Sequence, residues 1–213
     1  MINKKPNILL LGCPGSGKGT VAKQLVAKQG YLQLSTGDMF RETIKSQSEL
    51  GKKVQALIAS GNLVSDDITN QLIESYIVKA LKDNQHFVLD GYPRTINQAQ
   101  FLDKICKLDQ VILLDCPQEL AIKRISGRLS CNQCGAIFNE YFNPPKVQGV
   151  CDCCGGQLIK RKDDAPESAL YRFSVYAKLT EPLINYYQKQ GLLTTIKMDQ
   201  DTDLYQEVLK VLK

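Results

Sequence analysis

A glycine-rich segment near the start of the chain has the residue types and spacing that bind phosphate. GCPGSGKGT, from Gly12 to Thr20, contains the pattern GxxxxGK between an apolar run and a segment of helical periodicity. In such a loop, backbone N–H groups surround phosphate oxygens at a helix N-terminus, and the lysine, here Lys18, reaches the outer phosphates. The sequence therefore predicts nucleotide binding. Gly19 stands where Ser or Thr usually follows the lysine, so the pattern supports phosphate binding better than magnesium coordination by Thr20.

Two polar segments farther along the chain predict a second anion site. STGDMFR, residues 35–41, combines helix-start residues with an arginine, and DGYPRT, residues 90–95, places Asp90 and Arg94 after an apolar run. Open α/β sheets bind ligands at the carboxyl ends of their strands. Helix capping and turn formation also explain either segment by itself. Because a protein that only hydrolyses a nucleotide needs one anion site, the two segments together indicate a phosphoryl acceptor.

The two basic residue types are used very unequally. Of 27 basic residues, six are arginine and the other 21 are lysine. One interpretation reserves arginine, whose rigid fork forms paired hydrogen bonds, for phosphate contacts. The alternative is a lysine-rich composition with six arginines placed by chance, and their positions have to decide. The six are Arg41, Arg94, Arg124, Arg128, Arg161 and Arg172.

Five of the eight cysteines lie in one segment, residues 128–164. Their CxxC…CxxC spacing predicts a closed tetrahedral zinc site, although it leaves iron open as the metal. The predicted ligands are Cys131, Cys134, Cys151 and Cys154. Cys153 breaks the CxxC step and is expected to point away from the metal.

Disulfide bonds are the main alternative for these cysteines, and a reducing cytosol disfavours them. Cys13, Cys106 and Cys116 are scattered and are expected to stay unpaired, the last two as small core residues. A metal in residues 128–164 would be structural, because so short a segment cannot build an adequate core. Structural zinc contributes about 10–16 kcal/mol of apparent binding free energy.

Short apolar runs alternate with segments of helical periodicity along most of the chain. The alternation predicts the α/β class, with a P-loop type core whose five-stranded parallel sheet is flanked by helices. Residues 36–65, with two helical stretches and no strand between them, and residues 128–164 interrupt it. The expected strands are residues 7–12, 31–35, 86–90, 110–116 and 192–198. The expected helices are residues 19–29, 66–81, 96–107 and 166–190, with a terminal helix from residue 202.

In this order along the chain, GxPGxGKGT, STGDxxR and DGYPRTxxQA resemble the adenylate kinase family of nucleoside monophosphate kinases, from Ile8 to about Tyr187. The resemblance implies the reaction MgATP + AMP ⇌ 2 ADP, with ATP, AMP and ADP as partners, Mg²⁺ accompanying ATP, and a structural Zn²⁺. It also implies a core of residues 1–34, 66–127 and 165–213, a helical NMP-binding insertion of residues 35–65, and a zinc-ribbon-like lid of residues 128–164.

The resemblance assigns roles to individual residues. The implied ATP-binding residues are Gly15, Ser16, Gly17, Lys18, Gly19, Thr20, Arg124, Arg128, Ile137, Phe138 and Gln200, the last standing where the family usually has a glycine. The implied AMP-binding residues are Thr36, Arg41, Gly61, Asn62, Leu63, Val64, Gly91, Tyr92, Pro93, Arg94, Gln98, Arg161 and Arg172. The implied catalytic residues are Lys18, Arg94, Arg128, Arg161, Arg172 and Asp90, which would orient magnesium through water. Asp163 and Asp164 match the family's lid hinge.

Two other functions compete with this one. The first keeps the fold but uses GMP, UMP or CMP as acceptor, although Thr36 and Gln98 favour AMP by resemblance. The second is a zinc-ribbon nucleic-acid-binding protein with a nucleotide switch, which should expose basic and aromatic residues across the ribbon. Residues 131–160 contain only Lys146 and Lys160 as basic residues, so we expect no nucleic-acid partner.

The composition is that of an ordinary globular protein, with 43% hydrophobic and 23% charged residues among 213, which argues against a disordered or fibrous chain. The formal net charge of +5 permits a nucleic-acid partner without demanding one. No apolar run approaches the roughly 18 residues of a membrane span. We therefore expect a cytoplasmic protein with no membrane partner. We also expect a monomer.

Overall fold

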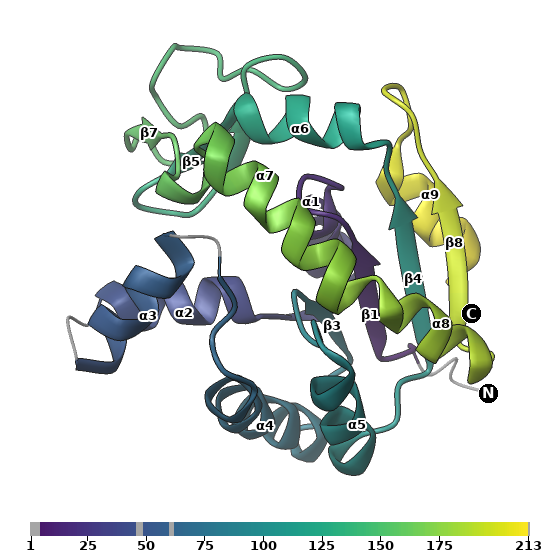
Figure 1. Ribbon diagram of the computed structural model, residues 1–213. Helices are drawn as coiled ribbons and strands as arrows, with labels where there is room; N and C mark the ends of the chain where they lie inside the picture. The colour runs from purple at the N-terminus through teal and green to yellow at the C-terminus, as the bar shows by residue number, and fades with distance from the viewer. Residues whose placement is uncertain (1–4, 46–48, 60–61, 213) are drawn as a thin grey trace.

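The computed structural model describes residues 5–45, 49–59 and 62–212. A five-stranded sheet lies at its centre, with helices around it (Figure 1). The strands lie in the order β2-β3-β1-β4-β8, and every neighbouring pair is parallel. Their carboxyl ends therefore meet at one edge, where the polar segments of the sequence follow them. The strands are β1 (Ile8–Gly12), β2 (Leu32–Ser35), β3 (Phe87–Asp90), β4 (Gln110–Asp115) and β8 (Leu193–Lys197). The predicted fold class is confirmed.

Helices cover both faces of this sheet. Outside residues 36–65 they are α1 (Lys18–Gln29), α4 (Asp66–Lys82), α5 (Ile96–Ile105), α6 (Gln118–Ser126), α7 (Pro166–Val175), α8 (Pro182–Lys189) and α9 (Leu204–Val211). Because alternate strand residues point to opposite faces, Leu9 and Leu11 are buried with α4, α5 and α8, whereas Ile8 and Leu10 are buried with α1 and α9. In the part of the chain that the structure describes, no helix is both long and apolar enough to cross a membrane.

The prediction of one helix over residues 166–190 is wrong. After α7 the backbone widens into a π-helical segment, Tyr176–Thr180, and α8 then begins at Pro182. Pro182 has no N–H to continue the regular ladder, and the N–H of Glu181 donates to the carbonyl oxygen of Tyr176 at 2.9 Å. The interruption contacts the site described below, because Thr180 Oγ1 donates to the carbonyl oxygen of Arg94 at 2.9 Å.

The described residues between 36 and 65 contain the two expected helices and a small apolar cluster. The helices are α2 (Thr36–Lys45) and α3 (Glu49–Ala59). Phe40, Val54 and Val64 are buried together there, separately from the side chains packed on the sheet. Ordinary apolar packing therefore holds this region together.

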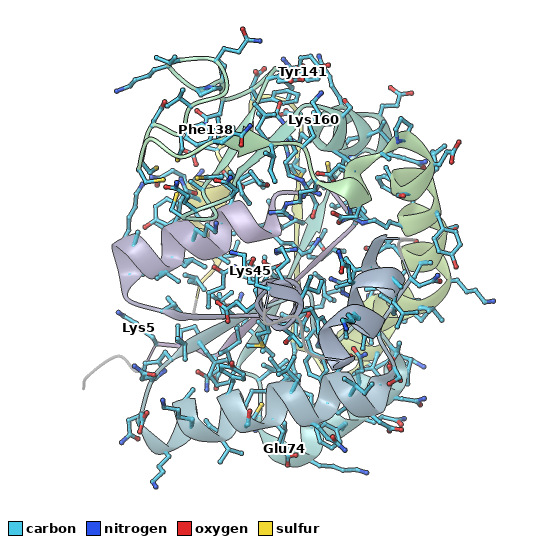
Figure 2. All side chains as sticks on the ribbon, turned by 90° about the vertical axis from the view of Figure 1, so that its left-hand side faces the viewer. Lys5, Lys45, Glu74, Phe138, Tyr141 and Lys160 are labelled. Atoms are coloured by element: carbon cyan, nitrogen blue, oxygen red, sulfur yellow. The ribbon has the colours of Figure 1, made fainter. Side chains whose placement is uncertain are left out.

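Residues 128–164 form a small antiparallel sheet in the order β6-β5-β7. Its strands are β5 (Arg128–Cys131), β6 (Ile137–Asn139) and β7 (Leu158–Ile159). Only Cys131, Phe138, Cys151 and Leu158 form its buried cluster, so two of the four members are cysteines. Figure 2 labels Phe138, Tyr141 and Lys160 in this region, at the opposite end of the molecule from Glu74 on α4.

Candidate active site and metal centre

One cavity of about 520 Å³ lies at the carboxyl ends of the central strands, with walls from the phosphate loop, the α2–α3 region and residues 128–164. All six arginines of the chain line it, whereas among the described residues only Lys18 and Lys23 of the 21 lysines do so. Chance placement does not explain this separation. The arginines gather where a polyanionic ligand would meet them from several sides.

The phosphate loop takes a shape that its glycines permit. Gly15 has φ +83°, and a Cβ there would lie 2.4 Å from the carbonyl oxygen of Ala121 in α6. Gly17 has φ +92° immediately before α1 begins at Lys18. Larger residues would therefore strain the loop or push it away from α6. The first residues of α1, from Lys18 to Thr20, line the cavity, and an anion is favoured at such a helix N-terminus.

Lys18 is held inside this loop. Its Nζ donates to the carbonyl oxygens of Gly12 at 2.7 Å and Cys13 at 2.9 Å, and to Ser16 Oγ at 3.2 Å. Burial lowers the pKa of Lys18 to about 8, against the opposing effect of Asp90. A phosphate oxygen beside this ammonium would favour its protonated form.

Asp90 brings an oxygen ligand close to the phosphate loop. A Cβ on Gly19 would lie 3.2 Å from Asp90 Oδ2, which also accepts a hydrogen bond from Gln33 Nε2 at 3.2 Å. Gly19 therefore allows this carboxylate to approach the start of α1. Carboxylate oxygens beside bound phosphates suit Mg²⁺, so the residues present fit that ion. The Thr20 side chain is exposed and also lines the cavity.

The segment after β3 is organised around the carbonyl oxygen of Gly91. This oxygen accepts hydrogen bonds from Thr36 Oγ1 and Arg94 Nε, both at 2.8 Å. Gln98 Oε1 accepts the N–H of Arg94 at 2.7 Å, which fixes the backbone of that residue. Burial, followed by the nearby charge of Arg172, lowers the pKa of Arg94 to about 10. An anion in the cavity would relieve this unfavourable burial of positive charge.

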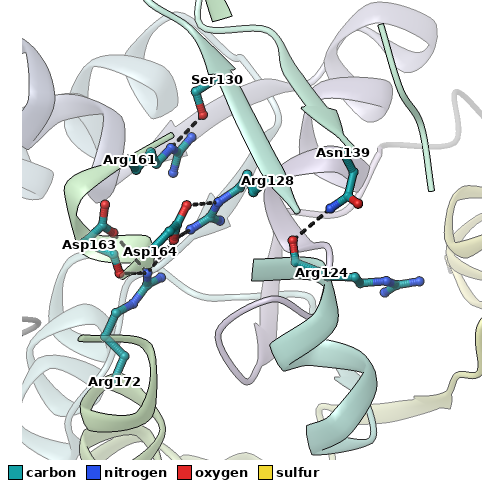
Figure 3. A network of polar contacts seen from close by, with 8 residues as sticks. All are labelled: Arg124, Arg128, Ser130, Asn139, Arg161, Asp163, Asp164 and Arg172. Atoms are coloured by element: carbon teal, nitrogen blue, oxygen red, sulfur yellow. Dashed lines mark hydrogen bonds and ion pairs between the residues drawn. The ribbon is translucent and has the colours of Figure 1, made fainter. Parts of the chain in front are cut away.

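Three arginines meet where residues 128–164 join α7 (Figure 3). Arg128 donates through Nε and Nη2 to both carboxylate oxygens of Asp164. Arg172 Nη1 lies 3.0 Å from Asp163 Oδ2 and 3.2 Å from Asp164 Oδ1. Arg161 donates to Ser130 Oγ at 2.8 Å, and burial followed by repulsion from Arg128 lowers its pKa to about 10. The two carboxylates thus pair with Arg128 and Arg172, whereas Arg161 is bonded to a neutral hydroxyl, which leaves positive charge for a ligand.

Arg124 is directed away from these three arginines (Figure 3). Its guanidinium carbon lies 5.6 Å from the ring centre of Phe142. Its Nη1 is buried and has no hydrogen-bond partner among the described residues. A buried donor without a partner is costly, so a ligand acceptor at this wall of the cavity would be stabilising.

The four predicted metal ligands form one cluster. The Sγ atoms of Cys131 and Cys154 are 3.5 Å apart, those of Cys134 and Cys151 are 3.6 Å apart, and all four lie within 4.8 Å of one another. Zn–S bonds of about 2.3 Å in a tetrahedron place sulfurs roughly 3.8 Å apart. The cluster could therefore bind a zinc ion. Cys153 is exposed and is not a member of it.

The chain matches the family model described as adenylate kinase over residues 10–192. The chain belongs to the adenylate kinase family. It is 45% identical over 213 residues to an adenylate kinase of Thermosipho africanus (strain TCF52B), covering 97% of this chain and 99% of that protein. It is 46% identical over 213 residues to an adenylate kinase of Methanosarcina barkeri (strain Fusaro / DSM 804), covering 97% and 98%. An adenylate kinase of Listeria innocua serovar 6a is 41% identical over 211 residues, covering 96% and 98%.

Family membership confirms the resemblance drawn from the sequence motifs. It supports the predicted enzyme class, a phosphotransferase acting on ATP and AMP, and does not favour the GMP, UMP or CMP alternatives or the nucleic-acid-binding one. Adenylate kinases use Mg²⁺ with ATP, which agrees with the position of Asp90 beside the phosphate loop.

Most residues that the adenylate kinase resemblance assigns to nucleotides line the cavity. Among the assigned residues that the structure describes, three do not line the cavity: Ser16, Tyr92 and Gln200. Ser16 is buried beneath the loop, and Tyr92 is buried with its hydroxyl donating to Asn70 Oδ1 at 2.7 Å. Gly61 lies outside the described residues.

Near the C-terminus, Thr202 to Tyr205 line the cavity, while Gln200 is exposed beside it. Asp203 caps α9 by accepting the N–H groups of Tyr205 and Gln206. An Asp directly before an amphipathic helix is a typical N-cap, so the sequence contained a local signal for the start of α9. Other lining residues carried no motif that sequence reasoning could use: Lys23, Gln24, Gln33, Asn139, Phe142, Asn143, Val175, Tyr176 and Thr180.

Proposed function

We propose that this chain catalyses the reversible reaction MgATP + AMP ⇌ 2 ADP in the cavity described above. The observation that carries the proposal is the convergence of all six arginines on one cavity that also holds Lys18. Phosphoryl transfer between two nucleotides gathers many phosphate charges, and its attacking oxygen is already ionised near neutral pH. Positioning and charge neutralisation therefore suffice, without a side-chain nucleophile.

We assign ATP to the phosphate loop side and AMP to the side of α2 and β3. Gly15 to Thr20, Arg124 and Arg128 would hold the ATP phosphates, with Ile137 and Phe138 beside the adenine. Thr36, Arg41, Gly91 and Gln98 would hold AMP, together with the strip from Asn62 to Val64. Lys18, Arg94, Arg128, Arg161 and Arg172 would stabilise the charge that develops during transfer.

We also propose the division into parts that the family pattern suggests. Residues 35–65 would be the NMP-binding insertion and residues 128–164 the lid, with the remainder as the core. Asp163 and Asp164, which hold Arg172 and Arg128, would act as the lid hinge. Closure of the lid over both nucleotides would exclude water, the competing acceptor.

Two metals belong to this proposal. Asp90 would hold Mg²⁺ beside the phosphate loop, where the ion would neutralise charge on the ATP phosphates. Cys131, Cys134, Cys151 and Cys154 would bind a structural Zn²⁺, for which their sulfur spacing supports a tetrahedral site.

We propose that the enzyme works as a monomer without a nucleic-acid partner. A single chain supplies walls on every side of the cavity, which supports a monomer. Lys160, one of two basic residues between positions 131 and 160, is paired with Glu140 at 3.1 Å and adds little basic surface. Gel filtration and a gel shift with single-stranded nucleic acid test these two points.

The acceptor is tested by following ADP formation from MgATP with AMP, GMP, UMP, CMP or no acceptor. We expect rapid, reversible conversion with AMP alone. Preference for another monophosphate would keep the fold and mechanism but replace the assigned acceptor. Hydrolysis that does not depend on an acceptor would exclude the second site.

The site itself is tested by Lys18→Ala and Arg94→Ala, with Lys82→Ala at an exposed position of α4 as the matched control. The two site variants should fold normally, and their transfer rates should fall by about 10³-fold or more, because each removes a charge that faces the phosphates. The control should keep the parental rate. Near-normal turnover of either site variant would exclude the assigned role.

A further inference from the structure

Cys13 and Cys116 lie next to each other although they are 103 residues apart. β1 and β4 are neighbouring parallel strands, paired through Gly12 and Leu114, and each cysteine follows shortly after its strand. Cys13 Sγ lies 3.8 Å from the carbonyl oxygen of Cys116, to which the Cys13 thiol donates a hydrogen bond. The structure therefore pairs two cysteines that their sequence positions leave apart.

The two thiols differ in exposure and in acidity. Cys13 is 9% exposed, whereas Cys116 is half-buried and accessible to a small reagent. The neighbouring Cys13 thiol lowers the pKa of Cys116 to about 7, and the charges of Arg124 and Lys18 also lower it. The neighbouring Cys116 thiol and burial raise the pKa of Cys13, which stays protonated. An accessible thiolate beside a second thiol is the arrangement of reactive, redox-sensitive cysteines.

Cys13 is also part of the phosphate loop. Its carbonyl oxygen accepts hydrogen bonds from Lys18 Nζ at 2.9 Å and from the N–H of Ser16 at 3.2 Å. A covalent bond from Cys13 to the end of β4 would therefore restrain the loop at the residue that positions Lys18. Displacements of about 1 Å in such a site cost roughly 10²-fold in rate.

We propose that Cys13 and Cys116 are a redox-sensitive pair, in which a peroxide oxidises Cys116 and Cys13 then closes a disulfide that inactivates the phosphate loop. In the first step, the Cys116 thiolate attacks one peroxide oxygen. The S–O bond forms, the O–O bond breaks, and hydroxide leaves and takes a proton to become water. In the second step, Cys13 sulfur attacks Cys116 sulfur, the S–O bond breaks, and the Cys13 proton leaves with the hydroxyl as water. A dithiol reductant reverses the reaction.

Cys106 provides a matched control within the same chain. It is buried, 8% exposed, and burial followed by the charges of Asp103 and Asp109 raises its pKa to about 12. Its thiol is therefore a poor nucleophile at neutral pH. Tryptic peptides separate the two residues, because Cys106 lies in Ile105–Lys107 and Cys116 in Leu108–Lys123.

The test treats zinc-loaded parental protein, Cys116→Ser and Cys106→Ser with hydrogen peroxide. Transfer activity, zinc content and disulfide-linked peptides are then measured. The parental protein and Cys106→Ser should yield the peptide linking Cys13 to Cys116 and lose about tenfold or more of their activity, which dithiothreitol should restore. Cys116→Ser should start with parental activity and keep it. The activity measurement rests on the proposed function, whereas the linked peptide does not.

Two outcomes would contradict the proposal that Cys13 and Cys116 are a redox-sensitive pair. The first is an oxidised parental protein without the Cys13–Cys116 peptide. The second is Cys116→Ser losing activity as fast as the parental protein, in step with zinc release, which would make the lid cysteines the target. If no preparation transfers phosphate to AMP, the proposed function fails, and the peptide map alone decides the redox pair.

Discussion

The two regions that flank the cavity, α2–α3 and residues 128–164, are stabilised in different ways. In the α2–α3 region, Phe40 of α2 and Val54 of α3 form an apolar cluster with Val64, which follows α3 in the chain. In residues 128–164, the proposed lid, strands of two to four residues alternate with turns, and the buried cluster of four contains two cysteines. A metal can replace apolar packing where short strands and turns leave too few side chains to bury.

The two regions also differ in the charge that they bring to the cavity. The α2–α3 region contributes Arg41, whose side chain is 38% exposed and paired with Asp38 at 2.5 Å. The lid contributes Arg128 and Arg161, and Arg128 is only 16% exposed. Because buried charge interacts more strongly with a ligand than exposed charge does, the lid should contribute more to catalysis.

The largest expected effect tests this difference in charge. Arg128→Ala should lower kcat by about 10³-fold or more, since a buried guanidinium facing the transferred phosphoryl group is lost. Arg41→Ala should raise KM for AMP by about tenfold and change kcat little, because its charge is partly exposed and already paired with Asp38. Steady-state kinetics with both substrates varied measures both. Equal losses of kcat would remove the distinction between the two regions.

The next effect tests the metal. Cys151→Ser should abolish zinc binding and lower the free energy of unfolding by more than about 3 kcal/mol, which corresponds to roughly 6–12 °C in Tm. Cys153→Ser is the matched control, because Cys153 lies beside the cluster but outside it, and it should change stability by about 0.5 kcal/mol or less. Zinc content and thermal unfolding are the measurements. The reverse order of the two variants would mean that the ligand set is wrong.

A smaller effect tests the apolar cluster. Val54 is 1% exposed, and Val54→Ala should cost about 2 kcal/mol and raise KM for AMP, with zinc content unchanged. Gln55→Ala, at the exposed neighbouring position on α3, is the control and should change neither quantity. Denaturant unfolding, zinc analysis and AMP kinetics measure these. Zinc loss in Val54→Ala would show that the two regions do not fold independently.

The smallest expected effect is a pH dependence that comes from Lys18, which lies in the core between the two regions. The pKa of Lys18 is about 8, so this side chain is charged below that pH and loses its charge as the pH rises. The value of kcat/KM for ATP should therefore fall above pH 8, by at most about tenfold per pH unit. Val54→Ala should give the same profile, because Lys18 belongs to neither insertion. A flat profile through this range would contradict the assignment of Lys18.

Patterns of nearby residues predicted a large part of this protein. GxxxxGK between a strand and a helix identified the phosphate loop, because the geometry of one turn depends on residues within it. Likewise, CxxC spacing identified the four sulfurs of the cluster, since each pair lies on one short turn. The helix over residues 166–190 was predicted incorrectly, because its apolar periodicity continues through Tyr176–Thr180 while the backbone does not.

The sequence by itself determined the α/β class, the phosphate loop, the four clustered cysteines and the family. Only the tertiary structure decided that six arginines share one cavity, that Thr202 to Tyr205 line it instead of Gln200, and that Cys13 meets Cys116. The physical reason is the distance along the chain over which each interaction acts. Turns, caps and periodicity act over a few residues, whereas these contacts depend on strand order, which places β1 beside β4 although β2 and β3 lie between them in the chain.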